Sequence, residues 1–340
     1  MKLALAGLAT SGKSTLMRAL TGRRIAVAKG STDASQALLP VPDERVDKLS
    51  AIYNPKKTIY AQITFIDPAP PMAKADDPTT KLPPELHQAD GLLEVVRNFD
   101  GGLGAPDPAG DHQAFQDEMI ISDLITVERR LERIAEERKR GREIDQEEIS
   151  LLEQCKDQLN AEKPLRLMPQ LAGHLKLKGF GLLTAKPVVV VANNDEDDPE
   201  PPELGSEAEP VVVRGAIEAE LVDLDDEERA EFMADLGLNQ SALDRLIEAG
   251  YRALDVISFF TVGEDEVRAW TVRRGALAPQ AAGVIHSDME KGFIRAEVIR
   301  HEDLIEHGSE AAIKKVGLMK LAGKEYAVQD GDIFHVRFNV

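Results

Sequence analysis

The sequence has a single cysteine, Cys155, among its 340 residues, so an internal disulfide is excluded and a reducing compartment such as the cytosol is favoured. It lacks an apolar run of the roughly 20 residues that a membrane-spanning helix needs, and it lacks a basic leader with a cleavable apolar segment. Positive charge is also scarce: the formal net charge of −19 opposes diffuse binding to a phosphate backbone. We therefore expect a cytoplasmic protein that contacts neither membrane nor DNA and meets RNA only through a local basic patch.

A phosphate-binding motif is present near the start of the chain. Residues 7–14 read Gly-Leu-Ala-Thr-Ser-Gly-Lys-Ser, a complete G-x-x-x-x-G-K-[ST] loop, directly after the apolar run Leu3–Ala6. In such a loop the backbone N–H groups surround a triphosphate, Lys13 reaches the β- and γ-phosphates, and Ser14 ligates Mg²⁺. The motif identifies phosphates but not the base. The residues predicted to bind nucleotide here are Gly7, Ala9, Thr10, Ser11, Gly12, Lys13, Ser14 and Thr15.

Two later strand-like segments place further residues beside this loop. Residues 186–192 form a β-branched run typical of a strand buried on both faces, and it ends in Asn193-Asn194-Asp195-Glu196. Residues 210–213 form a second run that ends in Arg214-Gly215-Ala216. Phosphate-loop GTPases carry Asn-Lys-x-Asp at the end of the former strand, and the Asp reads the guanine edge; here Glu196 stands in that register. The residues predicted to contact the base are Asn193, Asn194, Glu196, Gly215 and Ala216. Alternating strands and helices of this type predict a doubly wound α/β sheet.

The segment Tyr60–Asp67 is typical of a strand that ends in a carboxylate, and Asp67 is the natural second Mg²⁺ partner through water. Prolines follow at Pro68, Pro70 and Pro71, where a switch GTPase has a glycine whose N–H serves the γ-phosphate. Gln88 is too remote to orient an attacking water. We assign no catalytic residue, and both slow hydrolysis and binding with little turnover remain open.

A segment of different character runs from Asp117 to about Asn160. It has no proline, one glycine and many Glu, Arg, Lys and Leu residues. Apolar side chains recur at spacings of three and four along two stretches, which predicts the seam of two amphipathic helices. These side chains are Leu124, Val127, Leu131 and Ile134, then Ile149, Leu152, Cys155 and Leu159. Between them lie Arg138-Lys139-Arg140-Gly141-Arg142, so we predict an antiparallel hairpin whose basic tip is either a solvated turn or a partner-binding surface.

With the phosphate loop, several segments resemble the YchF/Obg-like ATPase group of translation-factor-related phosphate-loop proteins. They are 39–49, the helical insertion, 193–196, 259–263, 266–271, 278–283, 285–288, 290–296 and 330–332. The resemblance covers essentially the whole chain; it is strongest in the last third and weakest between Lys74 and Gln116.

This resemblance implies an ATPase, with ATP and Mg²⁺ as cofactors, that couples nucleotide state to the ribosome or another translation component. It implies ATP rather than GTP because Asn193 and Glu196 match the family's Asn-x-x-Glu. The longer carboxylate of Glu196 would sit badly for guanine N1–H and N2–H₂, whereas adenine presents a donor at N6. The family also has a hydrophobic residue in place of the hydrolytic glutamine. Residues 68–71 and 73–80 depart from the family's glycine-containing switch, and Ser31 or Thr32 is left for sensing Mg²⁺. The predicted metal ligands are Ser14, Asp67 and Thr32.

The segment from about Ile257 to Val340 resembles a TGS module, a small β-grasp fold. Its pattern predicts strands over 267–272, 292–298 and 333–338 and a helix over 309–322. Its exposed cations would either contact RNA or form a solvated helix face; they are Lys314, Lys315, Lys320 and Lys324.

The expected architecture is α/β. A doubly wound phosphate-loop domain takes residues 1–116 and 181–256, an inserted helical hairpin takes 117–180, and a TGS-like α+β domain takes 257–340. Three functions are compatible with it: a cytosolic ATPase of the YchF type, a degenerate nucleotide-stabilised scaffold that does not hydrolyse, and a GTP-using switch.

Overall fold

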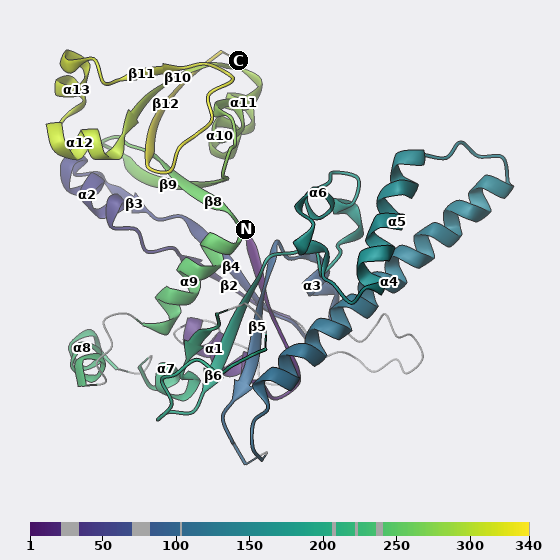
Figure 1. The fold of residues 1–340 in the computed structure, drawn as a ribbon. Helices are drawn as coiled ribbons and strands as arrows, with labels where there is room; N and C mark the ends of the chain where they lie inside the picture. The colour runs from purple at the N-terminus through teal and green to yellow at the C-terminus, as the bar shows by residue number, and fades with distance from the viewer. Residues whose placement is uncertain are drawn as a thin grey trace. The chain divides into compact units, whose positions relative to one another are not determined.

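The computed structural model describes residues 1–21, 34–69, 82–102, 104–205, 209–221, 224–235 and 241–339. The chain divides into two units. The first contains Met1–Ala37 and Thr64–Gly250, and the second contains Leu38–Ile63 and Tyr251–Val340. Figure 1 shows the elements of both units along the chain. None of the described helices is both long and apolar enough to cross a membrane.

The first unit is built on a six-stranded sheet in the order β2-β4-β1-β5-β6-β7. β1 pairs in parallel with β4 and β5, β5 with β6, and β6 with β7, so the carboxyl ends of these five strands lie at one edge. The strand order reverses at β1, and ligands of open α/β sheets bind outside the carboxyl ends at such a point. The strands are β1 (Lys2–Ala6), β2 (Ser35–Pro40), β4 (Gln62–Asp67), β5 (Gly91–Asn98), β6 (Val188–Asn194) and β7 (Val211–Val213).

The central strands are continuous apolar runs because both of their faces are covered. Leu3, Leu5, Leu92 and Val191 are all fully buried. The helices and short 3-10 turns of this unit are α1 (Lys13–Thr21), α3 (Pro84–Gln88), α4 (Pro108–Lys139), α5 (Gln146–Asn160), η2 (Leu165–Leu167), α6 (Pro169–Ala172), η3 (Lys178–Phe180), α7 (Gly215–Leu221), α8 (Asp226–Asp235) and α9 (Ala242–Ala253).

The predicted helical hairpin is present as α4 and α5. Both helices have an aspartate cap: Asp107 accepts from the Gly110 N–H at 3.0 Å, and Asp145 accepts from the Glu147 N–H at 3.0 Å. The predicted apolar positions form the seam, since all eight belong to one hydrophobic cluster. Helix α4 begins at Pro108, before the expected residue 117, because Asp107 caps it and proline suits the first helical position.

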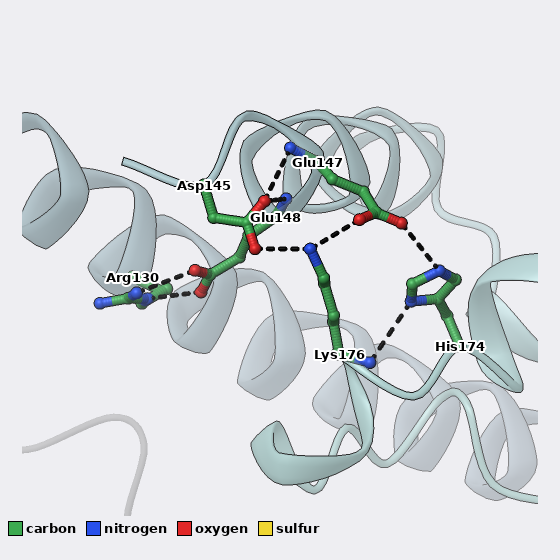
Figure 2. Close-up of polar contacts among 6 residues, drawn as sticks. All are labelled: Arg130, Asp145, Glu147, Glu148, His174 and Lys176. Atoms are coloured by element: carbon green, nitrogen blue, oxygen red, sulfur yellow. Dashed lines mark hydrogen bonds and ion pairs between the residues drawn. The ribbon is translucent and has the colours of Figure 1, made fainter. Parts of the chain in front are cut away.

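Ion pairs fasten the hairpin to the loop that follows α6 (Figure 2). Arg130 of α4 holds Glu148 of α5 with two bonds, Nε to Oε1 at 2.7 Å and Nη2 to Oε2 at 3.0 Å. Lys176 contacts Asp145 and Glu147 together, the latter at 2.6 Å from Nζ to Oε2. These contacts pair the acidic side chains at the start of α5 with cations inside the same unit.

The second unit has its own six-stranded sheet, in the order β11-β10-β12-β8-β9-β3. β10 runs antiparallel to β11 and β12, β8 antiparallel to β9, and β12 parallel to β8. Helix α10 packs Ala278, Ala281 and Ala282 against buried sheet residues such as Phe259 and Phe334. The elements are α2 (Glu44–Tyr53), β3 (Lys57–Ile59), β8 (Val256–Thr261), β9 (Glu266–Arg273), α10 (Ala278–Ile285), α11 (Ser287–Lys291), β10 (Phe293–Arg300), α12 (His301–His307), α13 (Glu310–Val316), β11 (Lys320–Ala322) and β12 (Asp332–Phe338).

Residues 38–63 also belong with this unit, which their sequence pattern did not predict. β3 pairs in parallel with β9, and Arg45 of α2 donates to Asp330 at 2.9 Å while its guanidinium lies over the Phe260 ring. The helix expected over 309–322 is also shorter. Gly317 adopts φ 74° and ends α13 at Val316, after which β11 pairs with β10.

Candidate nucleotide-binding site

The phosphate loop lies between β1 and α1, as predicted, and three of its residues have a positive φ: Gly7 (116°), Thr10 (64°) and Gly12 (94°). A Cβ at Gly7 would overlap the main-chain oxygen of Val95 on β5, and one at Gly12 would overlap the side-chain nitrogen of Asn193. Both neighbours therefore approach the loop so closely that only glycine fits.

The Lys13 ammonium is held inside the loop. Its Nζ donates to the main-chain oxygens of Gly7 at 3.1 Å and Leu8 at 2.6 Å, and it lies 3.4 Å from the Ser11 hydroxyl. Burial lowers the pKa of Lys13, and the nearby negative charge of Asp67 acts in the opposite direction. The cation is therefore positioned by carbonyl oxygens that the oxygens of a phosphate can replace.

Ser14, at the start of α1, and Asp67, at the end of β4, are joined by a hydrogen bond. Burial raises the pKa of Asp67, while a hydrogen bond from Ser14 and the charge of Lys13 lower it. A hydroxyl and a carboxylate are suitable ligands for Mg²⁺, so these two side chains fit the ion. No group of three or more His, Cys, Asp or Glu side chains that could hold a metal occurs within the described ranges. A magnesium here would take most of its ligands from phosphate and water.

Several predicted switch residues cannot be placed. Ser31, Thr32, Pro70, Pro71 and residues 73–80 lie outside the described residues. Pro68 and Ala69 directly follow β4 and are half-buried. Since Pro68 has no N–H, this position offers no backbone donor to a ligand.

Asn193 connects the loops on the two sides of the site. Its Nδ2 donates to the Ser11 carbonyl at 3.1 Å, and its Oδ1 accepts from the Gly215 N–H at 3.1 Å. The side chain is buried, with 7% of its surface exposed. The structure thus brings together the phosphate loop, the end of β6 and the start of α7, as expected for strands whose carboxyl ends share an edge.

The neighbouring predicted residues are placed differently. Asn194 turns into its own loop, where Nδ2 donates to the carbonyls of Asp198 at 3.0 Å and Glu200 at 2.6 Å. Its side chain therefore shapes the 195–200 loop. Glu196 is exposed on that loop, Gly215 is buried and Ala216 is exposed. Thr10 and Ala9 are exposed on the phosphate loop, while Ser11 is buried.

Residues at the end of β5 adjoin the site, and they are not among those predicted from the sequence. The Phe99 ring lies 3.8 Å from the position that a Gly12 Cβ would occupy. Arg97 fixes the loop around Phe99 by donating to the carbonyls of Phe99 at 3.2 Å and Gly104 at 3.1 Å. The apolar residues Leu92, Leu93, Val95 and Val96, interrupted by Glu94, could have predicted this strand. Its pairing with β1 brings its end to the phosphate loop.

A buried polar network joins the same strand to the hairpin. Glu94 of β5 is fully buried; its Oε1 lies 2.8 Å from His112 Nδ1, and its Oε2 accepts from Gln116 Nε2 at 2.6 Å. Arg166 in turn donates to Gln116. Because both His112 and Gln116 belong to α4, the base of the hairpin is attached to a strand that ends at the phosphate loop.

At the other end of the hairpin, the turn between α4 and α5 is basic and exposed, as predicted. Arg138, Lys139, Arg140 and Arg142 are all exposed, and Arg140 has an acidic neighbour, Glu136, at 3.6 Å. An ion pair this open contributes little to stability, so the cations are available to a partner.

Comparison with known proteins agrees with this arrangement. A model of the YchF-GTPase_C family, described as a protein of unknown function (DUF933), matches residues 256–339. The protein named Ribosome-binding ATPase YchF from Bacillus subtilis (strain 168) is 38% identical over 98% of this chain and 98% of its own. The protein of that name from Escherichia coli O157:H7 is 37% identical over 100% of this chain and 99% of its own. The solved structure of the Schizosaccharomyces pombe YchF GTPase matches with a TM-score of 0.84 at 31% identity, covering 99% of this chain and 97% of that one. This chain belongs to the YchF family.

Proposed function

We propose that this protein is a purine nucleoside triphosphatase that prefers ATP and couples nucleotide binding to contact with the ribosome in the cytoplasm. The observation that carries the proposal is the phosphate loop with Lys13 held inside it. Asn193, which bonds to Ser11 and lies against Gly12, joins this loop to the loops that would enclose a base. The names of the bacterial relatives, which are ribosome-binding ATPases, support it.

Different residues of the loop contact different parts of the triphosphate. The backbone N–H groups of 7–14 surround the anion, and Lys13 exchanges its carbonyl contacts for phosphate oxygens. Ser14 and Asp67 would hold Mg²⁺, which when bound neutralises charge on the phosphate oxygens. Asn193 keeps the loop in this shape through its contact with Ser11.

The purine would lie between the 195–200 loop and the turn before α7, with Phe99 near the phosphate loop. Glu196 is the acceptor that we assign to the adenine N6 amino group. A carboxylate one methylene longer than aspartate is poorly placed for the two donors of guanine, which favours ATP over GTP.

Pro70 favours slow turnover. It stands three residues after Asp67 in the sequence, where a switch GTPase has the glycine whose N–H serves the γ-phosphate, and proline has no N–H. No glutamine follows closely enough in the sequence to orient water. A nucleotide-stabilised scaffold is therefore the second candidate function, and it differs from the first only in hydrolysis.

Calorimetry with ATP and GTP plus Mg²⁺, together with phosphate-release assays, tests both. We expect tighter binding of ATP, slow phosphate release and loss of both in Lys13→Ala. Lys48→Ala, which changes an exposed lysine of α2 in the second unit, is the matched control and should behave as wild type. Undiminished binding by Lys13→Ala would remove the site assignment, absent phosphate release would leave the scaffold, and preference for GTP would indicate a GTP-using switch.

The ribosome contact is assigned to the basic hairpin tip, with the lysines of the TGS-like C-terminal unit as the alternative surface. Co-sedimentation with ribosomes should fail when Arg138, Lys139, Arg140 and Arg142 are all changed to Glu. The matched variant changes the exposed Lys314, Lys315, Lys320 and Lys324 to Glu. Loss of co-sedimentation only in the second variant would move the contact to the C-terminal unit.

A further inference from the structure

The loop that carries Glu196 is tied to the sheet on the side of β5. The Asp195 N–H donates to the Asn98 carbonyl at 3.2 Å, and the Asn98 side chain donates to Asp198 Oδ2 at 3.2 Å. Asn194 holds the same loop through the Asp198 carbonyl at 3.0 Å. These contacts fix the residues on either side of Glu196.

Glu196 itself is held from the opposite side, by Arg214. The Arg214 Nη1 donates to the main-chain oxygen of Glu196 at 3.2 Å, across a gap of 18 residues in the sequence. The backbone of Arg214 is fixed in turn, because its carbonyl accepts from the Glu218 N–H at 3.0 Å and the next N–H, of Gly215, is bound by Asn193. The guanidinium therefore spans from the turn before α7 to the loop after β6.

We propose that Arg214 is a positioning residue that sets the purine selectivity of the site by fixing the backbone from which the Glu196 side chain extends. The proposal rests on the proposed function, in which Glu196 faces the base. A carboxylate is only an acceptor, and it could accept from both N1–H and N2–H₂ of guanine if its loop were free to shift. With the loop held by Arg214, the carboxylate keeps the placement that suits the single amino group of adenine.

The position of the guanidinium agrees with this role. Glu218 is buried, and the positive charge of Arg214 lowers its pKa against the larger effect of burial. Arg214 thus lies near a buried carboxylate of the helix that follows it, α7, while its guanidinium donates to the Glu196 carbonyl. It is half-buried, which limits its freedom to leave this carbonyl.

The test measures dissociation constants for ATP and GTP with Mg²⁺, and for inorganic tripolyphosphate, by calorimetry on the full chain. Arg214→Ala should reduce the ratio of the GTP constant to the ATP constant by about tenfold, the effect of losing one charge-assisted hydrogen bond. Tripolyphosphate affinity should not change. Arg214→Lys keeps one donor and should retain part of the selectivity. Arg274→Ala, which removes an exposed guanidinium paired with Asp255, is the control.

A double-mutant cycle separates positioning from a merely structural effect. Glu196→Ala should also lower the selectivity ratio, and Arg214→Ala should add nothing in that background, because it acts through Glu196. An unchanged ratio in Arg214→Ala, or a parallel loss of tripolyphosphate affinity, would overturn the inference while leaving the proposed function intact. A wild-type protein without preference for ATP would overturn both.

Discussion

Replacement of Gly12 by alanine should disable the nucleotide site through Asn193, a residue 181 positions away in the chain. Gly12 has a φ of 94°, and a Cβ there would overlap the Asn193 side-chain nitrogen. The overlap is relieved only if the Asn193 amide turns away. That movement breaks its bond to the Ser11 carbonyl and its bond from the Gly215 N–H, both 3.1 Å long.

The expected loss of nucleotide-binding free energy follows from the backbone strain at residue 12 and the two lost hydrogen bonds. A left-handed conformation costs an L-residue about 1–2 kcal/mol, and each lost hydrogen bond costs about 1 kcal/mol net. Since part of this cost is recovered by relaxation of the loop, we expect nucleotide binding to weaken by about 2–3 kcal/mol, or roughly 30- to 150-fold in dissociation constant. Gly141→Ala at the hairpin tip is the matched control, because its φ is 73° but no atom lies within 4 Å of the added Cβ.

The assay is calorimetry with ATP and Mg²⁺ on wild type, Gly12→Ala, Asn193→Ala and the double variant. Because the new methyl group and the Asn193 amide compete for one space, the double variant should bind more tightly than the sum of the single effects predicts. Full additivity, or wild-type binding by Gly12→Ala, would show that Gly12 does not act through Asn193. Weakened binding in Gly141→Ala would mean that a general loss of stability, and not the site, is being measured.

Three further outcomes are expected. Burial raises the pKa of Cys155 to about 11, so its thiol should resist labelling at pH 8 in the native protein. Leu152→Ala removes a fully buried side chain of the same cluster and should lower the free energy of unfolding by about 2–5 kcal/mol, so it should speed labelling strongly. Leu167→Ala, at an exposed position, should not change the labelling rate. Burial raises the pKa of Asp67 in the folded protein, so the stability that its protonated form contributes to the ligand-free protein is present at low pH and is lost as the pH rises through that raised pKa. Mg²⁺-dependent nucleotide affinity should fall on acidification, starting at a pH above the ordinary range for aspartate. Asp67→Asn should weaken the Mg²⁺ response and remove its pH dependence in titrations. Arg45→Ala should speed hydrogen exchange at the Lys56 and Lys57 amides by roughly 3- to 30-fold, because it removes an exposed bond to Asp330 and the contact with the Phe260 ring, together worth about 0.7–2 kcal/mol. Unchanged exchange would show that the β3 pairing alone secures residues 38–63.

Local patterns were sufficient for the elements whose physics is local. The phosphate loop could be read because its glycines and lysine stand at fixed spacing between an apolar run and a helix. The hairpin could be read because every third or fourth residue of both helices is apolar, and those residues do form its seam. Where a single residue changes the course of the backbone, as Gly317 does after α13, periodicity alone extended the helix too far.

Sequence patterns were enough to place the phosphate loop, the amphipathic hairpin with its basic turn and the strands suited to a parallel sheet, because spacing and side-chain type act over a few residues. Three contacts followed from the folded chain alone: Asn193 bonds to Ser11, Phe99 lies beside Gly12, and β3 joins the sheet of the second unit. Such contacts join segments that are distant in the sequence, and they depend on strand order and register, which are set by how the whole chain buries its apolar faces.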